Sequence, residues 1–288
     1  MVSVSDDHQA QADAIAGALR LYGVRAAPEP RASELADWSG SVSEAVIQLA
    51  RPDLATRILD VSSGRGEPAF RMARLLRPAA RIIVADPSRE DVQVAAIQVA
   101  KVAPASAGIC AAAEALPFAD ESFDLVTCQL GVAFFTDPVR GLAEMRRVLC
   151  RAGRLVLASW GPAGQSSVYQ STIAIIGTHV GVVPPDGDVP DPYRYGDGEL
   201  LGAELRRAGF SEFEQRLTTV ELRWAGDARG LWSMVERTNR TVQRVLVDLP
   251  NSRRELIVKE VVAALTNHSC DGNLVLPVAL RLAVAKRP

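Results

Sequence analysis

The stretch RILDVSSGRGEPAF, residues 57–70, combines the signals of a buried strand, a glycine turn and the start of a helix. Gly64 and Gly66 let the backbone approach a ligand closely, and Pro68 suits the first turn of a helix. The N-terminus of such a helix offers unpaired N–H groups to an anionic group. We therefore expect a nucleotide-like cofactor at this loop, although two serines stand where further glycines are usual.

Strands and helices alternate on both sides of this stretch. Two helices are predicted before it. The first is a short amphipathic helix at 9–22, and the capping box Ser41-x-x-Glu44 indicates the start of the second. The alternation predicts a parallel sheet with helices on both faces, the doubly wound α/β architecture. The predicted strands are 57–61, 81–86, 107–112, 123–129 and 154–160, and the predicted helices between them are 67–76, 88–103 and 139–150.

A helix and a long proline-rich loop interrupt this alternation after residue 160, and the loop is too long for a simple connection. A helix at 199–208 and a strand at 212–224 resume the pattern, before a mostly helical stretch at 227–267 and a last strand. We interpret the two insertions as a mostly helical cap. The predicted division is 1–37 as a helical arm or lid, 38–160 as the cofactor-binding Rossmann-like core, 161–196 as a cap insertion, 197–224 as core, 225–272 as helical cap and 273–288 as the final core strand.

Composition and charge exclude several classes of partner. Hydrophobic residues make up 48% of the chain, and a formal net charge of −2 leaves no basic field for a nucleic acid. The first ten residues do not form a signal peptide, and no segment approaches the roughly 20 apolar residues of a membrane span, so we expect a cytoplasmic protein. The dispersed cysteines indicate buried side chains rather than disulfides or a metal site; they are Cys110, Cys128, Cys150 and Cys270.

The glycine loop alone does not decide which cofactor is bound. Residues 64–69 also satisfy the dinucleotide pattern G-x-G-x-x-A, which is a weak signal. Asp86, at the end of the second strand, can accept hydrogen bonds from ribose hydroxyls or can simply cap the next helix. A nicotinamide-dependent oxidoreductase is one alternative, but the sequence has no Tyr-x-x-x-Lys pair. A purely structural partner protein is another.

Residues 112–163 read AAEALPFADESFDLVTCQLGVAFFTDPVRGLAEMRRVLCRAGRLVLASWGPA. This run closely resembles the class I S-adenosylmethionine-dependent methyltransferases of the UbiE-like type (methyltransferase type 11). The resemblance continues through YRYGDGELLGAELRRAGF and DGNLVLPVALRLAVAKR, so it covers the chain from about residue 38 to the end. It implies a seven-stranded Rossmann-like sheet, S-adenosyl-L-methionine as cofactor, and methyl transfer to carbon or oxygen of a small lipophilic metabolite in natural-product biosynthesis.

The resemblance also implies a set of cofactor-binding residues. The loop after the first strand would hold the methionine part of the cofactor, the end of the second strand its ribose, and the end of the fourth strand its sulfonium. The adenine would lie between a proline after the second strand and an Ala-Glu pair. These implied residues are Asp60, Ser62, Gly64, Arg65 and Gly66 for methionine, Asp86 for ribose, Pro87, Ala113 and Glu114 for adenine, and Gln129 and Leu130 beside the sulfonium.

Three residues depart from the family pattern. Ser62 replaces the first glycine of the usual loop, and Arg65 stands where threonine is usual, so its guanidinium must turn to solvent or reach a carboxylate. Ala112 replaces an aspartate that accepts from the adenine amino group, a loss of about 0.5 to 1.5 kcal/mol. These departures motivate one alternative: a relative that binds the cofactor and catalyses a cyclisation without methyl transfer.

Two further residues are functional candidates. Tyr22, at the end of the first helix, could fold over the cofactor as a lid, within the chain or from a neighbouring subunit of a homo-oligomer, or it could simply pack that helix. His179 could project from the cap toward the substrate as a general base, although a surface histidine fits its position too. Carboxylates such as Glu236 are equally possible, and an electron-rich carbon acceptor needs no strong base.

Overall fold

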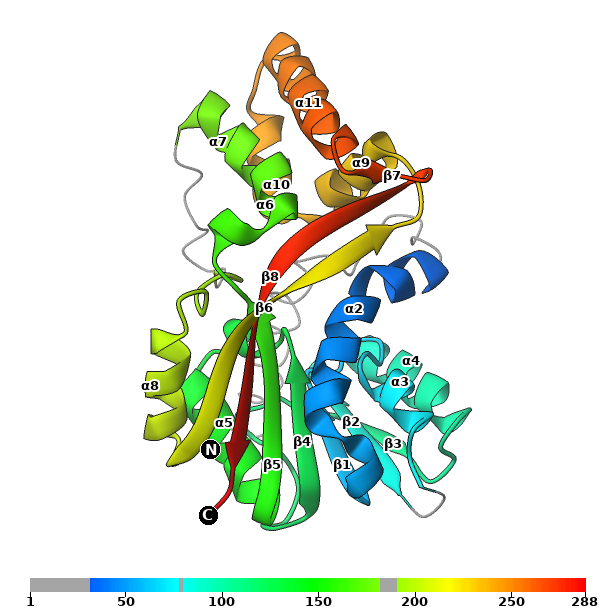
Figure 1. Ribbon diagram of the computed structural model, residues 1–288, viewed down its shortest axis with the longest axis vertical. Helices are drawn as coiled ribbons and strands as arrows, with labels where there is room; N and C mark the ends of the chain where they lie inside the picture. The colour runs from blue at the N-terminus through cyan, green and yellow to red at the C-terminus, as the bar shows by residue number, and fades with distance from the viewer. Residues whose placement is uncertain (1–31, 78–79, 182–190) are drawn as a thin grey trace, which may run out of the picture.

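The computed structural model describes residues 32–77, 80–181 and 191–288. Its centre is a sheet whose main strands run in the order β3-β2-β1-β4-β5-β8-β6, with the short strand β7 beside β8 (Figure 1). This sheet confirms the predicted seven-stranded Rossmann-like α/β architecture. The strands are β1 (Arg57–Val61), β2 (Arg81–Asp86), β3 (Ala107–Cys110), β4 (Phe123–Gln129), β5 (Leu149–Trp160), β6 (Glu212–Trp224), β7 (Ser269–Cys270) and β8 (Asn273–Lys286).

The strand order places the glycine loop at a binding edge. Parallel pairing joins β3, β2, β1, β4 and β5, and β8 then lies antiparallel between β5 and β6. The order reverses between β1 and β4, and ligands of doubly wound sheets bind at such a point, beyond the carboxyl ends of the strands. The loop that follows β1 lies there.

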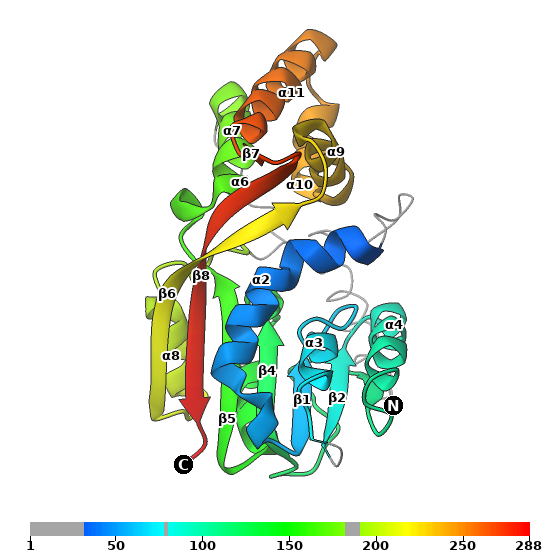
Figure 2. The same ribbon diagram turned by 45° about the vertical axis from the view of Figure 1, so that its right-hand side comes forward.

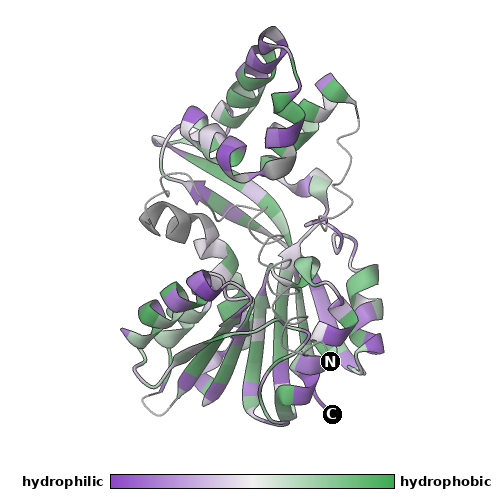
Figure 3. Ribbon diagram, turned by 180° about the vertical axis from the view of Figure 1, so that it is seen from behind, coloured by the Kyte–Doolittle hydropathy of each residue, from purple (hydrophilic) through white to green (hydrophobic). Residues whose placement is uncertain are grey.

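Helices cover both faces of the sheet. Apolar side chains of α2, α3 and α4 pack on one face, and those of α5 and α8 pack on the other, in two separate clusters. Because both faces are covered, the parallel strands are largely apolar, as the mostly green strands of Figure 3 show. These helices are α2 (Ala32–Ala50), α3 (Ala69–Ala73), α4 (Arg89–Ala100), α5 (Pro138–Val148) and α8 (Glu199–Arg207).

Further helices gather at one end of the molecule, which we call the helical end (Figures 1 and 2). They rest on a ribbon formed by β6 and β8, because β5 pairs with β8 only from Leu280 onward whereas β6 pairs from Leu274 onward. Leu222, Trp224 and Leu276 of this ribbon are buried in the same cluster as the helices. The helical end consists of α6 (Ser167–Ser171), α7 (Ile173–Val180), α9 (Ala228–Thr238), α10 (Arg240–Val247) and α11 (Asn251–Thr266). The exact division of the chain into core and cap segments stays a prediction.

Two element boundaries differ most from the sequence prediction. The proposed capping box was wrong, because α2 begins at Ala32 and Ser41 lies inside it. The helix continues through Gly40, where an added Cβ would lie 3.0 Å from the guanidinium of Arg71, so this glycine permits close packing. β5 begins at Leu149, which pairs with β4 before a shift in register. No helix in the described part of the chain is long and apolar enough to cross a membrane.

Candidate functional site

The loop after β1 turns the chain through three residues with positive φ: 55° at Ser62, 49° at Gly64 and 113° at Gly66. Two hydrogen bonds fix it: the N–H of Ser63 donates to the carbonyl of Ala85 in β2 at 3.1 Å, and the N–H of Gly66 donates to that of Ser63 at 2.8 Å. The left-handed backbone at Ser62 explains why glycine is usual there, since any other residue adopts it at a cost of about 1 kcal/mol.

The two glycines of this loop have different functions. A Cβ added at Gly64 would meet no described atom within 4 Å, so this face of the loop is open to a ligand. A Cβ at Gly66 would lie 3.3 Å from the Cα of Ala95, so Gly66 lets the loop pack directly on α4. The loop therefore has one open side and one side fixed to the core.

Asp86, at the end of β2, fixes the loop from the neighbouring strand. Its carboxylate accepts from the N–H of Gly64 at 2.9 Å and from the N–H of Ser88 at 2.8 Å, and only 2% of the residue is exposed. Burial raises the pKa of Asp86 to about 6. A carboxylate has about four acceptor positions, so this one can still accept from hydroxyl groups of a ligand.

Two buried side chains at the carboxyl ends of β1 and β4 carry open acceptors, which we define as buried oxygens that accept no hydrogen bond of normal length and angle from any described residue. Asp60 is fully buried; its Oδ1 accepts from the hydroxyl of Thr127 at 2.6 Å, whereas its Oδ2 is open. Burial raises the pKa of Asp60 well above its usual value, although the hydroxyl of Thr127 and the nearby N–H of Ala69 oppose this shift. The Oε1 of Gln129, which is 9% exposed, is also open. Buried acceptors without partners are uncommon and indicate a ligand site or ordered water.

The end of β4 packs closely against the loop after β1. Leu130 has a φ of 62°, and its N–H donates to the carbonyl of Ala158 in β5 at 2.7 Å. A Cβ at Gly131 would lie 2.4 Å from the Cβ of Ser62, so only glycine fits beside that serine. The structure thus brings Asp60, Ser62, Gly64, Gly66, Asp86, Gln129 and Leu130 together around one edge of the sheet.

The residues expected near adenine lie on the other side of Asp86. Pro87 and Ala113 are buried, and Glu114 is 4% exposed. The Oε1 of Glu114 accepts from the N–H groups of Thr136 and Asp137 at 2.8 and 3.3 Å. This carboxylate therefore holds the turn that precedes α5, and an adenine contact at this position stays a prediction.

Two further charged residues complete the loop. Arg65 reaches a carboxylate of its own chain, since its guanidinium lies 4.0 Å from the Oδ1 of Asp91 in α4. Glu67, which the sequence pattern did not single out, places its Oε1 3.1 Å from the guanidinium of Arg71, and the hydroxyl of Ser43 in α2 also lies beside this carboxylate. The signal for Glu67 in the sequence was its place directly after the last glycine of the loop.

The candidate base and lid residues lie elsewhere. His179 is on α7 in the helical end, where its Nε2 lies 2.8 Å from the Oε2 of Glu260 on α11, and its backbone carbonyl accepts from Arg253. Figures 1 and 2 show α7 far from the loop between β1 and α3, so the structure does not group His179 with the loop residues. Its catalytic role stays a prediction, and Tyr22 lies outside the described residues.

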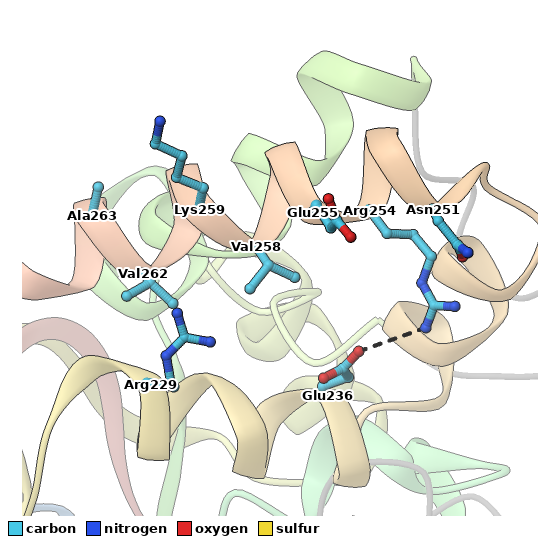
Figure 4. A pocket seen from close by; sticks show the side chains of 9 residues that line it. All are labelled: Arg229, Glu236, Asn251, Arg254, Glu255, Val258, Lys259, Val262 and Ala263. Atoms are coloured by element: carbon cyan, nitrogen blue, oxygen red, sulfur yellow. Dashed lines mark ion pairs between the residues drawn. The ribbon is translucent and has the colours of Figure 1, made fainter.

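A cavity of about 620 Å³ lies between α9 and α11 (Figure 4). Val258 points into it, and Arg254 lies 4.0 Å from Glu236 at one end. None of the predicted cofactor residues lines this cavity. Within the described ranges, no group of His, Cys, Asp and Glu side chains could hold a metal ion.

Comparison with known proteins agrees with this fold. A family model described as "Methyltransferase domain" matches residues 59–157. The ubiquinone/menaquinone biosynthesis C-methyltransferase UbiE of Dinoroseobacter shibae is 32% identical over 188 residues, which are 61% of this chain and 74% of that protein. A structure of a methyltransferase from Bacillus halodurans matches 86% of this chain and 100% of its own with a TM-score of 0.55 at 20% identity. The [4+2]-cyclase SpnF matches 99% of this chain and 96% of its own with a TM-score of 0.50 at 19% identity, which is a likeness of fold.

Proposed function

This chain belongs to the UbiE-like family of class I S-adenosylmethionine-dependent methyltransferases, and from that premise we propose that it methylates a small lipophilic acceptor. The relative from Dinoroseobacter shibae is named as a C-methyltransferase of ubiquinone and menaquinone biosynthesis. This name favours a ring carbon of a quinone-like molecule as the acceptor, rather than the natural-product setting expected from the sequence.

The observation that carries the proposal is the pair of open acceptors on Asp60 and Gln129, beside the open face of Gly64. A buried carboxylate without a partner is costly unless a cation joins it. S-adenosylmethionine carries two cationic groups, a sulfonium and an ammonium, and ribose hydroxyls that suit Asp86. The residues present therefore fit this cofactor.

Each part of the site has a role in binding. Asp60 would attract the cationic methionine part, and Asp86 would orient the ribose while it holds Gly64 in place. Gln129 and Leu130 end the strand next to this loop, so they would define the side from which an acceptor approaches. The cofactor supplies a methyl group on a good leaving group, so the protein contributes mainly alignment, which is worth about 7 to 11 kcal/mol.

The apolar surroundings favour a lipophilic acceptor. Ala158 pairs with Gln129, and Trp160 lies two residues further on the same face of β5. Trp160 and Leu130 pack against the cluster that also includes the helical end. A ring placed there would meet apolar side chains, and an electron-rich ring carbon would need no strong base.

Calorimetric titration with S-adenosylhomocysteine tests the cofactor site. We expect binding by the wild type, at least tenfold weaker binding by Asp60→Asn, and unchanged binding by Glu212→Gln, an exposed carboxylate on β6. Absence of binding by the wild type would overturn the proposal.

Single-turnover mass spectrometry with a 1,4-naphthoquinol that has a free ring carbon tests the transfer. The expected product is heavier by one methylene unit and appears together with spent cofactor. Unchanged cofactor with a rearranged acceptor would instead support the cyclisation alternative.

A further inference from the structure

Ser62 in the loop after β1 lies directly against Gly131 in the turn after β4 (residues 130 and 131). A Cβ added at Gly131 would lie 2.4 Å from the Cβ of Ser62, 2.8 Å from its Oγ and 3.1 Å from the Sγ of Cys128. The first distance is far below the roughly 3.5 to 4.0 Å of van der Waals contact. The Cβ of Ser62 is also fixed by the backbone, so it cannot rotate away. The serine side chain therefore occupies the space that a larger residue at position 131 would need.

The backbone conformations of the two residues do not explain their residue types. Ser62 has a φ of 55°, where glycine is the usual residue. Gly131 has a φ of −75° and a ψ of −32°, which any residue adopts without strain. The close approach of Ser62 is therefore what requires glycine at position 131. The two residues are matched, because a side chain in the loop packs against bare backbone in the turn.

Hydrogen bonds hold both segments in place around this contact. In the loop, the N–H of Ser63 donates to the carbonyl of Ala85 in β2 at 3.1 Å. In the turn, the N–H of Leu130 donates to the carbonyl of Ala158 in β5 at 2.7 Å. A displacement of the turn toward Ser62 must therefore break one of these bonds or change the shape of the loop.

We propose that Ser62 and Gly131 form a positioning pair, through which the turn after β4 sets the shape of the loop after β1. This inference rests on the proposed function, since it assumes that this loop holds S-adenosylmethionine. The same contact fixes Gln129 and Leu130, which would define the side of acceptor approach, relative to the cofactor. The serine that departs from the family pattern thereby has a role of its own.

Packing alone would make a different prediction. If the contact served only the stability of the fold, crowding it would lower the free energy of unfolding, and the folded protein would bind the cofactor as before. A positioning pair requires in addition that crowding weakens cofactor binding by the folded protein. Cofactor affinity is therefore the measurement that separates the two roles.

The test begins with Gly131→Ala, which places a methyl group against Ser62. We expect a lower midpoint of unfolding in denaturant and, in the folded variant, about tenfold or greater loss of affinity for S-adenosylhomocysteine, measured by calorimetry. Adding Ser62→Gly to this variant removes the obstructing atoms and should restore most of both quantities. Adding Ser62→Ala instead is the matched control. It keeps the Cβ that the new methyl group would meet, so it should restore neither.

Several outcomes would overturn the inference. Unchanged affinity in folded Gly131→Ala would reduce the contact to packing. Failure of Ser62→Gly to restore affinity, or equal restoration by Ser62→Ala, would show that the Cβ of Ser62 does not join the two segments. If Gly131→Ala does not fold, the two double variants decide: only the one with Ser62→Gly should fold and bind. A wild-type protein that does not bind S-adenosylhomocysteine would overturn the proposed function as well, whereas the other outcomes overturn this inference alone.

Discussion

The backbone N–H of Gly64 donates to the carboxylate of Asp86 at 2.9 Å, which ties the loop after β1 to the end of β2. The same carboxylate accepts from Ser88, the N-cap of α4, whose side chain in turn accepts from the N–H of Asp91. One buried side chain thus sets the shape of the loop and the start of the next helix. A ribose bound to Asp86 would contact the residue that already organises the site.

Cofactor affinity should depend on pH through Asp86. Burial raises its pKa to about 6 in the empty protein, and ribose hydroxyls donate to the ionised form. At about pH 5 roughly one molecule in ten would have Asp86 ionised, so we expect about tenfold weaker binding of S-adenosylhomocysteine than at about pH 7.5. Calorimetry at both pH values measures this. The raised pKa of Asp60 contributes with the same sign, so Asp86→Asn should reduce the pH dependence without abolishing it.

The raised pKa of Asp86 also affects the free energy of unfolding, but with the opposite dependence on pH. Because the fold raises the pKa of this acid above 3.8, its contribution to the free energy of unfolding is fully present below about pH 4 and is lost as the pH rises through about 6. In Asp86→Asn this part of the pH dependence should be absent from denaturant titrations. An unchanged pH profile in the variant would show that Asp86 is not the titrating group.

Gly66→Ala should destabilise the protein. The backbone at Gly66 has a φ of 113°, and the new Cβ would lie 3.3 Å from the Cα of Ala95. We expect the free energy of unfolding to fall by about 1 to 3 kcal/mol, measured by denaturant titration. Gly177→Ala is the matched control, because no described atom lies within 4 Å of its added Cβ and α7 should gain helix propensity. Equal stability of the two variants would contradict this interpretation of the loop.

Ser62→Gly tests whether the serine that replaces the usual glycine of the loop weakens cofactor binding. Ser62 has a φ of 55°, so glycine removes a strain of about 1 kcal/mol and adds a similar loss of conformational entropy on folding. We expect the free energy of unfolding to change by less than about 1 kcal/mol and the affinity for S-adenosylhomocysteine to stay the same. A large gain of affinity would show instead that the serine impairs the loop.

The local pattern of the sequence predicted the strands and the loop, because both depend on neighbouring residues. Contacts between distant segments were not visible in it. The bond from Thr127 to Asp60 joins residues 67 positions apart, and the carboxylate of Glu114 bonds to the turn before α5. Likewise the start of α2 was missed, because Gly40 looks like a helix breaker until its packing against Arg71 is seen. The resemblance to a family supplied the expected site residues, but it did not show which of their oxygens are open.

Asp124→Asn should separate stability from binding. Asp124 accepts from Thr56 and Arg57 at the amino ends of β4 and β1, including the Arg57 guanidinium at 2.7 Å. Burial alone would raise the pKa of Asp124, but these bonds outweigh it and lower the pKa well below the usual 3.8. Asp124 therefore stabilises the fold above about pH 4, and this contribution is lost as the pH falls below that value.

We expect Asp124→Asn to lower the free energy of unfolding at neutral pH by about 1 to 3 kcal/mol, and the difference from the wild type to shrink in acid. The ion pair of Asp124 and Arg57 lies at the amino end of β1, whereas the glycine loop lies at its carboxyl end. The affinity of the folded variant for S-adenosylhomocysteine should therefore be unchanged. Denaturant titration at several pH values and calorimetry measure the two quantities. A variant that loses affinity while its stability is retained would contradict the placement of the cofactor at the carboxyl ends of the strands.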